Sequence, residues 1–155
     1  MQASVKWVSD ELFLGLSESG HSLLLDASSD SPVAPSPLEN VLLSIGSCSS
    51  VDVVSILQKS RQDISGCEVK ISAERVNTVP RVFSSIHLNF IISGNSISEK
   101  HVARAVQLSA EKYCSVAIML AGKVEILQRV EYQCQLELYE QSIQYRNLRL
   151  PTKTS

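Results

Sequence analysis

The stretch SPLENVLLSIGSCSSVDVVSIL, residues 36–57, decides the fold of this chain. Ser36 is a good N-cap residue, Pro37 fits the first helical position, and Glu39 completes the S-x-x-E pattern of a capping box. The pattern predicts a helix that begins after Ser36 and continues to about Ser65, where the left-handed conformation of Gly66 would end it.

Apolar side chains occupy nearly every angular position of this predicted helix, so we expect it to be buried on most sides. Gly46 weakens its helix propensity, which favours the close approach of another element at that position. A helix of about 28 residues would be roughly 42 Å long, too long for one small sheet to cover. We therefore expect a second copy of the chain to cover the remainder, in an intertwined homodimer.

Alternating apolar residues predict strands on both sides of the helix. Three short strands are expected before it and two longer ones after it, the latter joined by a hairpin-like turn at residues 77–80. A last strand should carry alternating apolar residues from Val130 to Leu138. The strands before the helix lie near residues 5–7, 12–16 and 23–25, and those after it near 69–73 and 82–92.

Two further helical segments are expected between the fifth and the last strand. Residues 96–99, Ser-Ile-Ser-Glu, match a second capping box. The helix that follows has an apolar stripe, and residues 116–120 predict one more helical turn, ended by Gly122. This order of elements predicts an α+β fold with helices packed on largely antiparallel sheets. The stripe consists of Val102, Ala105, Val106, Ser109 and Tyr113.

Length and composition narrow the functional classes. A chain of 155 residues with 44% hydrophobic content suits one domain, here residues 1–140, followed by a weakly patterned tail, 141–155. The net charge of −2 and the lack of a basic stripe argue against nucleic acid as a partner. The apolar runs fall short of a membrane span and the N-terminus lacks a signal peptide, so we expect a cytoplasmic protein that does not bind a membrane.

The four cysteines belong to no C-x-x-C pattern and to no Cys/His pattern with metal-ligand spacing, so we expect reduced thiols and no metal. Cys67 and Cys134 fit core positions of strands. Cys48 lies in the middle of the long helix, and Cys114 could act as N-cap of the turn that follows it, which would favour its thiolate. These two cysteines could form a redox pair or fill core space.

Residues 36–42 followed by 46–57 resemble the central-helix signature of the OsmC/Ohr superfamily, and residues 110–116 resemble its second cysteine motif. The segment 52–57 looks closer to the OsmC-like branch than to the Ohr branch. The resemblance implies an interlocked homodimer and a two-cysteine peroxidase that reduces organic hydroperoxides in oxidative stress defence. Cys48 would attack the peroxide and Cys114 would resolve the sulfenic acid, with an external thiol as reductant and no cofactor.

The chain departs from the family pattern at the cationic partner of the thiol. Similar peroxidases use an arginine from the N-terminal strands or the following loop, paired with a glutamate at the start of the helix. Residues 1–60 contain no arginine, and their cationic candidates are Lys6, Lys59 and His21.

Because Asp52, one turn after Cys48, opposes thiolate formation, we expect a cation near the Cys48 sulfur. Arg75 and Arg81, near the predicted hairpin, are the first candidates. Glu39 lies one residue after the position of the family glutamate, so it is either a catalytic residue or only part of the capping box. Asp52 itself is either a structural hydrogen-bond acceptor or a site residue.

Two functional hypotheses from different classes remain open. In the first, the protein is a thiol-dependent reductase of organic hydroperoxides, favoured by the paired cysteines. In the second, the same dimer is not catalytic and binds a hydrophobic ligand or a partner in its interface cleft, which the missing arginine favours.

Overall fold

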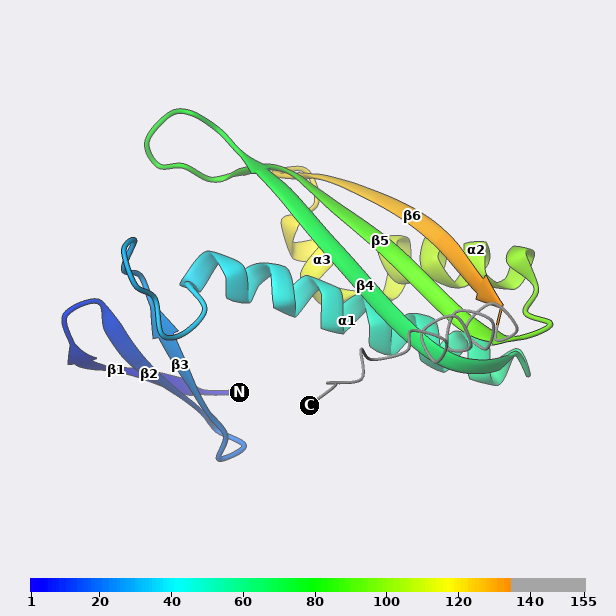
Figure 1. Cartoon of the computed structure of the whole chain (residues 1–155), viewed down its shortest axis with the longest axis horizontal. Coiled ribbons are helices and arrows are strands. Elements are labelled where there is room, and N and C mark those ends of the chain that lie inside the picture. Colours follow the sequence, from blue (N-terminus) through cyan, green and yellow to red (C-terminus); the bar gives the residue numbers. More distant parts are fainter. Residues whose placement is uncertain (135–155) are drawn as a thin grey trace, which may run out of the picture. The chain divides into compact units, whose positions relative to one another are not determined.

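The computed structural model describes residues 1–134, with side chains up to residue 132. The chain divides into two compact units, Met1–Ser44 and a second that begins at Ile45 (Figure 1). One helix runs through the boundary between them. The expected single domain of residues 1–140 stays a prediction, and the tail 141–155 lies outside the described residues, as do Leu136 and Leu138 of the expected last strand.

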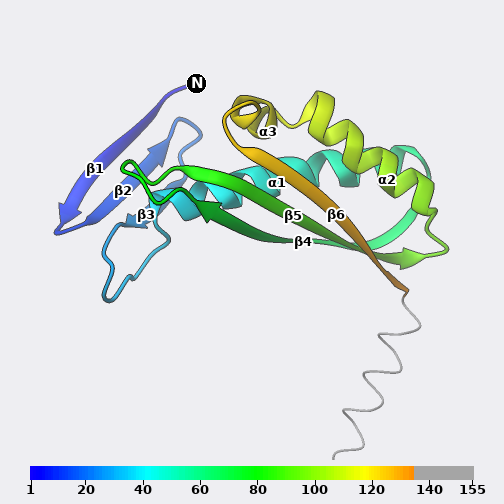
Figure 2. The same cartoon turned by 90° about the horizontal axis from the view of Figure 1, so that it is seen from above.

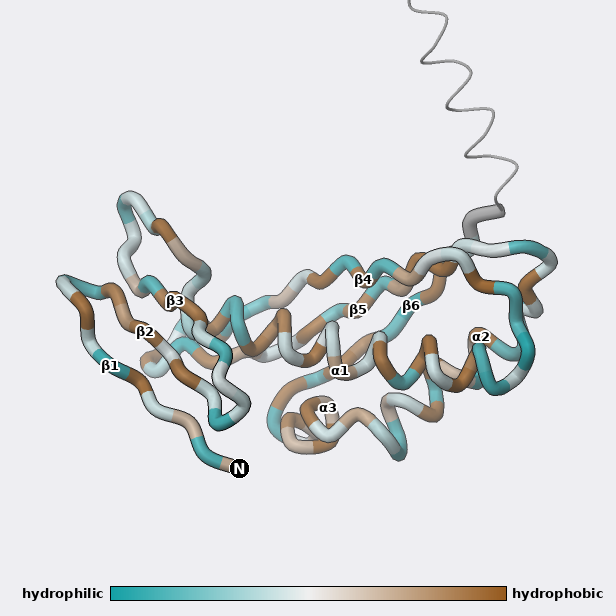
Figure 3. Tube along the Cα trace, turned by 90° about the horizontal axis from the view of Figure 1, so that it is seen from below, coloured by the Kyte–Doolittle hydropathy of each residue, from teal (hydrophilic) through white to brown (hydrophobic). Residues whose placement is uncertain are grey.

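The first unit contains a three-stranded antiparallel sheet in the order β1-β2-β3, which confirms the three short strands expected there. Its register aligns apolar residues on one face, where Trp7 pairs with Phe13 and Phe13 with Leu25. Hydrophobic residues continue along β2 and β3 (Figure 3). The strands are β1 (Ala3–Ser9), β2 (Leu12–Ser17) and β3 (Ser22–Asp26).

Helix α1, Pro37–Lys59, begins with the predicted capping box. The Ser36 amide donates to Glu39 Oε2 at 2.7 Å, and the Glu39 amide donates to Ser36 Oγ at 3.2 Å. These reciprocal bonds satisfy amide groups that the first turn of a helix leaves without partners. Both hydrogen bonds of the predicted capping box are therefore present, and the predicted start of the helix is confirmed.

The predicted end of α1 is wrong. The helix ends at Lys59, and the left-handed residue that follows it is Arg61, with φ 58°. The Gln62 amide donates to the Leu57 carbonyl and the Arg61 amide to the Gln58 carbonyl, which is the Schellman pattern. Gly66 instead lies inside a strand, next to a register shift. Hydrogen bonds to the last carbonyls thus ended the helix before the glycine was reached.

Helix α1 buries one face within the described chain, and its expected burial on the remaining sides by a second copy stays a prediction. Val53 and Leu57 on that face are inaccessible to solvent, whereas Val51 on another side is 69% exposed. Gly46 lies on the buried face, where an added Cβ would overlap the Cδ1 atom of Ile71. The predicted close approach at Gly46 is confirmed, and the element that approaches is the first strand of the second sheet.

By length and composition alone, α1 could also cross a membrane, contrary to the expectation that every apolar run is too short. A core helix of a soluble protein passes the same test, and one such helix is weak support for a membrane span. Its buried face, with Gly46 against Ile71, gives this apolar composition a packing role.

The second unit contains a mixed three-stranded sheet in the order β4-β5-β6. Strands β4 and β5 form the expected antiparallel hairpin, but β5 and β6 are parallel, which departs from the largely antiparallel sheet predicted. A parallel pair needs a long crossover, and α2 and α3 supply it. These helices and the second half of α1 cover one face of the sheet (Figures 1 and 2). The strands are β4 (Asp63–Arg75), β5 (Phe83–Asn95) and β6 (Glu125–Cys134).

The central strand β5 provides the core. Ile86, Leu88, Phe90 and Ile92 alternate toward the helices, and each is at most 1% exposed. Helix α2, Glu99–Leu108, packs Val102 and Ala105 into the same core, as the predicted stripe requires.

The prediction of a second capping box at residues 96–99 is wrong. The N-cap of α2 is Ser98, not Ser96, and its side chain makes no capping bond. The Ser98 amide instead donates to Gln62 Oε1 at 2.8 Å. Ser96 has φ 51° and belongs to the turn before the helix. A glutamine far away in the sequence therefore supports the entry to α2.

Candidate functional site

The fold brings Cys48, Asp52 and Cys114 together. The two sulfur atoms and a carboxylate oxygen of Asp52 all lie within 4.8 Å of one another. Cys48 and Asp52 are one turn apart on α1 and half-buried, and Cys114 is inaccessible to solvent. The tertiary structure therefore joins the two cysteines that the sequence singled out, and adds the carboxylate whose role the sequence left open.

A change in helix type places Cys114 at this point. After α2 the chain makes a π-helical turn, η1 (Ser109–Tyr113), and the Cys114 amide donates to the Ser109 carbonyl at 2.8 Å. Cys114 then adopts an extended conformation as N-cap of α3 (Ser115–Leu120), where its sulfur accepts from the Ala117 amide at 3.4 Å. The N-cap prediction is confirmed. The wider turn also leaves Tyr113 47% exposed, outside the stripe to which the sequence assigned it.

The thiolate character expected at Cys114 is not found. Burial raises the pKa of the Cys114 thiol, and the nearby Cys48 thiol raises it further. The Ser49 hydroxyl and the Ala117 amide oppose the shift without reversing it. Desolvation therefore outweighs the helix N-terminus, and Cys114 is held as a neutral thiol near neutral pH.

Two buried serines connect the three residues, and sequence reasoning gave them no role in the site. Ser49 Oγ donates to Cys114 Sγ at 3.2 Å, and Ser109 Oγ lies 3.2 Å from Asp52 Oδ2 and 3.4 Å from the Ser49 carbonyl. Both serines are inaccessible to solvent. The signal was present in the pattern, since each is a hydroxyl within an otherwise apolar helix face, where a buried polar group needs a partner.

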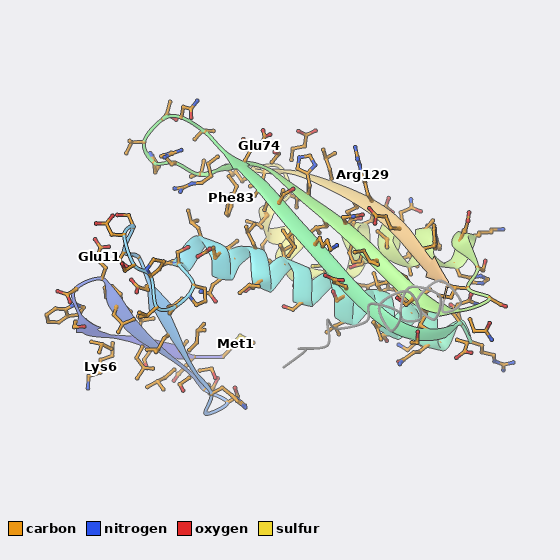
Figure 4. The ribbon with its side chains drawn as sticks, in the orientation of Figure 1. Met1, Lys6, Glu11, Glu74, Phe83 and Arg129 are labelled. Carbon is orange, nitrogen blue, oxygen red and sulfur yellow. The ribbon has the colours of Figure 1, made fainter. Side chains whose placement is uncertain are left out.

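Neither of the arginines expected near the Cys48 sulfur makes a contact with Cys48 within the part of the chain that the structure describes. Arg75 and Arg81 lie in the segment between Glu74 and Phe83, where β4 connects to β5, and both are exposed (Figure 4). Arg75 Nε donates to the Arg81 carbonyl at 2.6 Å. In the described chain, no cationic side chain is among the groups that shift the Cys114 pKa. The catalytic cation therefore stays a prediction.

Glu39 has the structural role that the sequence offered for it. Hydrogen bonds from the Ser36 amide and hydroxyl lower the pKa of its carboxyl group, so it stays an anion within the capping box. A catalytic role for Glu39 stays a prediction.

A cavity of about 350 Å³ opens beside Asp52. It contains Lys59, one of the cationic candidates of the sequence, and Tyr113 at the end of η1. Asp52 thus borders the cavity and also lies within 4.8 Å of both sulfur atoms, although neither cysteine lines the cavity. Its lining consists of Asp52, Ser55, Ile56, Lys59, Ser60, Leu108 and Tyr113.

Cys67 does not belong to this group. Cys67 lies half-buried on β4, and burial raises the pKa of its thiol, consistent with the expected packing role. The Cys134 side chain lies outside the described residues, so its core role stays a prediction. Two thiols and a carboxylate are a suitable donor set for a transition-metal ion, although the sequence showed no ligand spacing.

Sequence comparison identifies the class of protein. The profile of the family described as OsmC-like protein matches residues 28–127, a range that includes α1, the second sheet up to β6, and both cysteines. The chain belongs to the OsmC-like protein family.

Among its relatives, protein YhfA of Escherichia coli strain K12 is 55% identical over 131 residues, which are 84% of this chain and 97% of YhfA. A solved structure of a hypothetical protein from Aquifex aeolicus VF5 is 28% identical with a TM-score of 0.77, covering 86% of this chain and 96% of that one.

More distant solved structures share the fold alone. An organic hydroperoxide resistance protein from Elizabethkingia anophelis is 9% identical with a TM-score of 0.67, covering 84% of this chain and 94% of that one. The expected OsmC/Ohr-like α+β fold is thus confirmed.

Proposed function

We propose that this protein is a thiol-dependent peroxidase that reduces organic hydroperoxides with Cys48 and Cys114. One observation carries the proposal: two cysteines from separate parts of the sequence have their sulfurs within 4.8 Å of each other. Small side-chain rotations would bring such sulfurs to bonding distance. A distant relative of the same fold is named an organic hydroperoxide resistance protein, which supports this choice of substrate.

The chemistry balances with two thiols and one external reductant. The Cys48 thiolate attacks the distal peroxide oxygen, so an S–O bond forms, the O–O bond breaks, and the alkoxide takes a proton to leave as an alcohol. The sulfur of Cys114 then displaces hydroxide from the Cys48 sulfenic acid, giving a disulfide and, with the Cys114 proton, water. A dithiol reductant restores both thiols and is itself oxidised to a disulfide.

The burial of Cys114 suits the resolving role, because it protects the thiol from direct oxidation by solvent peroxide. Its raised pKa means that the proton must leave as the sulfur attacks the sulfenic acid, and the departing hydroxide can accept it. Cys48 is the more accessible of the two thiols. The division of labour assigned to the two cysteines therefore agrees with their burial.

The functional unit in this proposal is a homodimer. Among the described residues, the apolar face of the β1-β2-β3 sheet is exposed, with Val5 and Trp7 each 64% accessible to solvent. Val51 on α1 and Met119 on α3 are 69% and 71% exposed. Apolar surface on this scale is characteristic of an interaction site, and a second copy would cover it.

Peroxide titration of the reduced protein tests the catalytic proposal. With cumene hydroperoxide and a dithiol reductant, wild-type protein should consume peroxide, and mass spectrometry should find a Cys48–Cys114 disulfide. Cys48→Ser should reduce consumption to background. Cys114→Ser should permit one attack and then accumulate oxygen on Cys48.

Cys67→Ser is the matched control, because this half-buried thiol lies outside the group and its loss should leave consumption unchanged. Wild-type protein that consumes no peroxide and forms no disulfide would contradict the proposal. The cysteines would then belong to a binding scaffold.

A further inference from the structure

We propose that Cys48, Asp52 and Cys114, in their reduced state, form a binding site for one thiophilic divalent cation, of which Zn²⁺ is the natural representative. The proposal goes beyond the peroxidase function and does not depend on it, since binding requires only the reduced donors. It rests on the geometry of the three donor atoms, on the groups that hold them, and on the route by which an ion could reach them.

The donor atoms are close enough to share one ion. In tetrahedral zinc sites, Zn–S bonds of about 2.3 Å and Zn–O bonds of about 2.0–2.2 Å place neighbouring donors roughly 3.5–3.8 Å apart. The two sulfurs and the carboxylate oxygen all lie within 4.8 Å of one another, so rotations of side chains suffice to close the site. Cys48 and Asp52, one turn apart on α1, offer two ligands from one rigid helix.

Hydrogen bonds to two donor residues are already in place. Ser109 Oγ contacts Asp52 Oδ2, which orients the carboxylate and leaves its other oxygen for an ion. The Ser49 hydroxyl and the Ala117 amide both donate to Cys114 Sγ. Outer-shell donors of this kind fix metal ligands and stabilise a coordinated thiolate, and they are part of most metal sites.

The chemistry of the donors selects the ion. Two sulfurs favour a soft or borderline cation such as Zn²⁺, and exclude Mg²⁺ and Ca²⁺, which require oxygen ligands. On binding, both thiols would release their protons to solvent, and the ion would supply the positive charge that Cys114 lacks among the groups acting on it. The cavity beside Asp52 would admit the ion and leave a fourth position for water.

Metal and peroxide would compete for the same sulfurs. With both thiolates bound to one cation, Cys48 cannot attack a peroxide without first leaving the metal. Once a Cys48–Cys114 disulfide forms, two of the three ligands are lost and the ion is released. The site would therefore bind metal when reduced and release it when oxidised.

Cobalt substitution tests the proposal with no peroxide present. The full-length protein, reduced and freed of metal with a chelator, is titrated with Co²⁺, and zinc affinity follows from displacement of the cobalt. One Co²⁺ per chain with a thiolate-to-metal charge-transfer band is expected. Cys48→Ser and Cys114→Ser should each remove the band and weaken Zn²⁺ binding by more than the about 10–100-fold expected for Ser109→Ala, which removes only an outer-shell partner.

Cys67→Ser serves as the matched control and should bind as the wild type does, and circular dichroism verifies that each variant is folded. Reduced wild-type protein without a charge-transfer band, or a band that survives both Cys48→Ser and Cys114→Ser, would overturn the metal site. Neither result depends on peroxide turnover, so this failure is distinguishable from failure of the proposed peroxidase.

Discussion

The two compact units differ in where they keep their apolar residues. In the second unit, β5 lies between β4 and β6 under the helices, and Phe90 and Ile92 are inaccessible to solvent. In the first unit, the sheet also has three strands, but every residue of β1 is exposed. A three-stranded sheet becomes stable when its hydrophobic face is covered. The second unit therefore supplies its own core and the thiol site, whereas the first leaves apolar side chains of its sheet exposed.

Truncating the core of the second unit should have the largest effect. Phe90→Ala removes a fully buried aromatic side chain and should lower the free energy of unfolding by about 3–5 kcal/mol. Leu24→Ala in the first unit, at a position 44% exposed, should cost about 1 kcal/mol or less. Urea unfolding measures both. Equal costs for the two variants would contradict the assignment of the core to the second unit.

A charge introduced on the apolar face of the first unit should have the next largest effect. It should weaken association of the proposed homodimer more than it destabilises the folded chain. Val5→Glu places a carboxylate in that face and should weaken the proposed homodimer at least about 100-fold, because an unpaired charge would be buried. Light scattering and sedimentation across a concentration series measure the dissociation.

Ser4→Glu is the control, since it adds the same charge to the neighbouring residue of β1, on the opposite face of the sheet. If Val5→Glu and Ser4→Glu associate equally well, this face is not the interface.

The contact between α1 and β4 should show a smaller, reciprocal effect. Gly46→Ala adds a Cβ that overlaps Ile71 Cδ1, so this side chain must move, and the overpacking should offset the gain of about 1 kcal/mol that alanine brings in helix propensity. Ile71→Val removes that Cδ1 atom. The double variant should therefore be more stable than the sum of the single changes predicts, as measured in a double-mutant cycle. Simple additivity would mean that the contact is not tight.

The smallest effect should be the loss of stability at alkaline pH that ionisation of a buried thiol causes. It concerns the second unit alone, because the first contains no cysteine. Burial raises the pKa of the Cys114 thiol above its ordinary value of 9.0, so the folded state holds its proton more tightly than the unfolded state does. The resulting stability is fully present below that ordinary value and is lost as the pH rises through the folded-state pKa.

Between about pH 8 and about pH 10, the midpoint of urea unfolding should therefore fall less for Cys114→Ala than for the wild type. Cys67→Ala serves for comparison, because burial raises the pKa of that thiol too. An unchanged difference between the two pH values in Cys114→Ala would refute this role for Cys114.

The sequence predicted features that depend on neighbouring residues or on a strong local pattern. The capping box of Ser36 and Glu39 formed as expected, because both partners lie within one turn. Gly46 indicated a close contact because a missing side chain inside a helix needs a packing reason. Cys114 became the N-cap of α3 for the same local reason. Recognition of the family likewise rested on two short motifs.

Only the tertiary structure decided the features that depend on distant partners. The end of α1 was mispredicted for a local reason instead: Arg61 adopts the left-handed conformation that was expected of Gly66, and backbone bonds of Arg61 and Gln62 close the last turn at Lys59. Strand β6 became parallel to β5 because the helical crossover returns the chain to the same end of the sheet.

The site itself is a tertiary product as well. Ser49 and Ser109 joined it because a hydroxyl buried by packing must find a partner, and their partners lie 65 and 57 residues away, at Cys114 and Asp52. The sequence by itself determined which local elements form and which two thiols to examine. The burial that raises the pKa of Cys114, and the carboxylate beside both sulfurs, arise only when α1 packs against η1 and α3, since desolvation and proximity are properties of the folded chain.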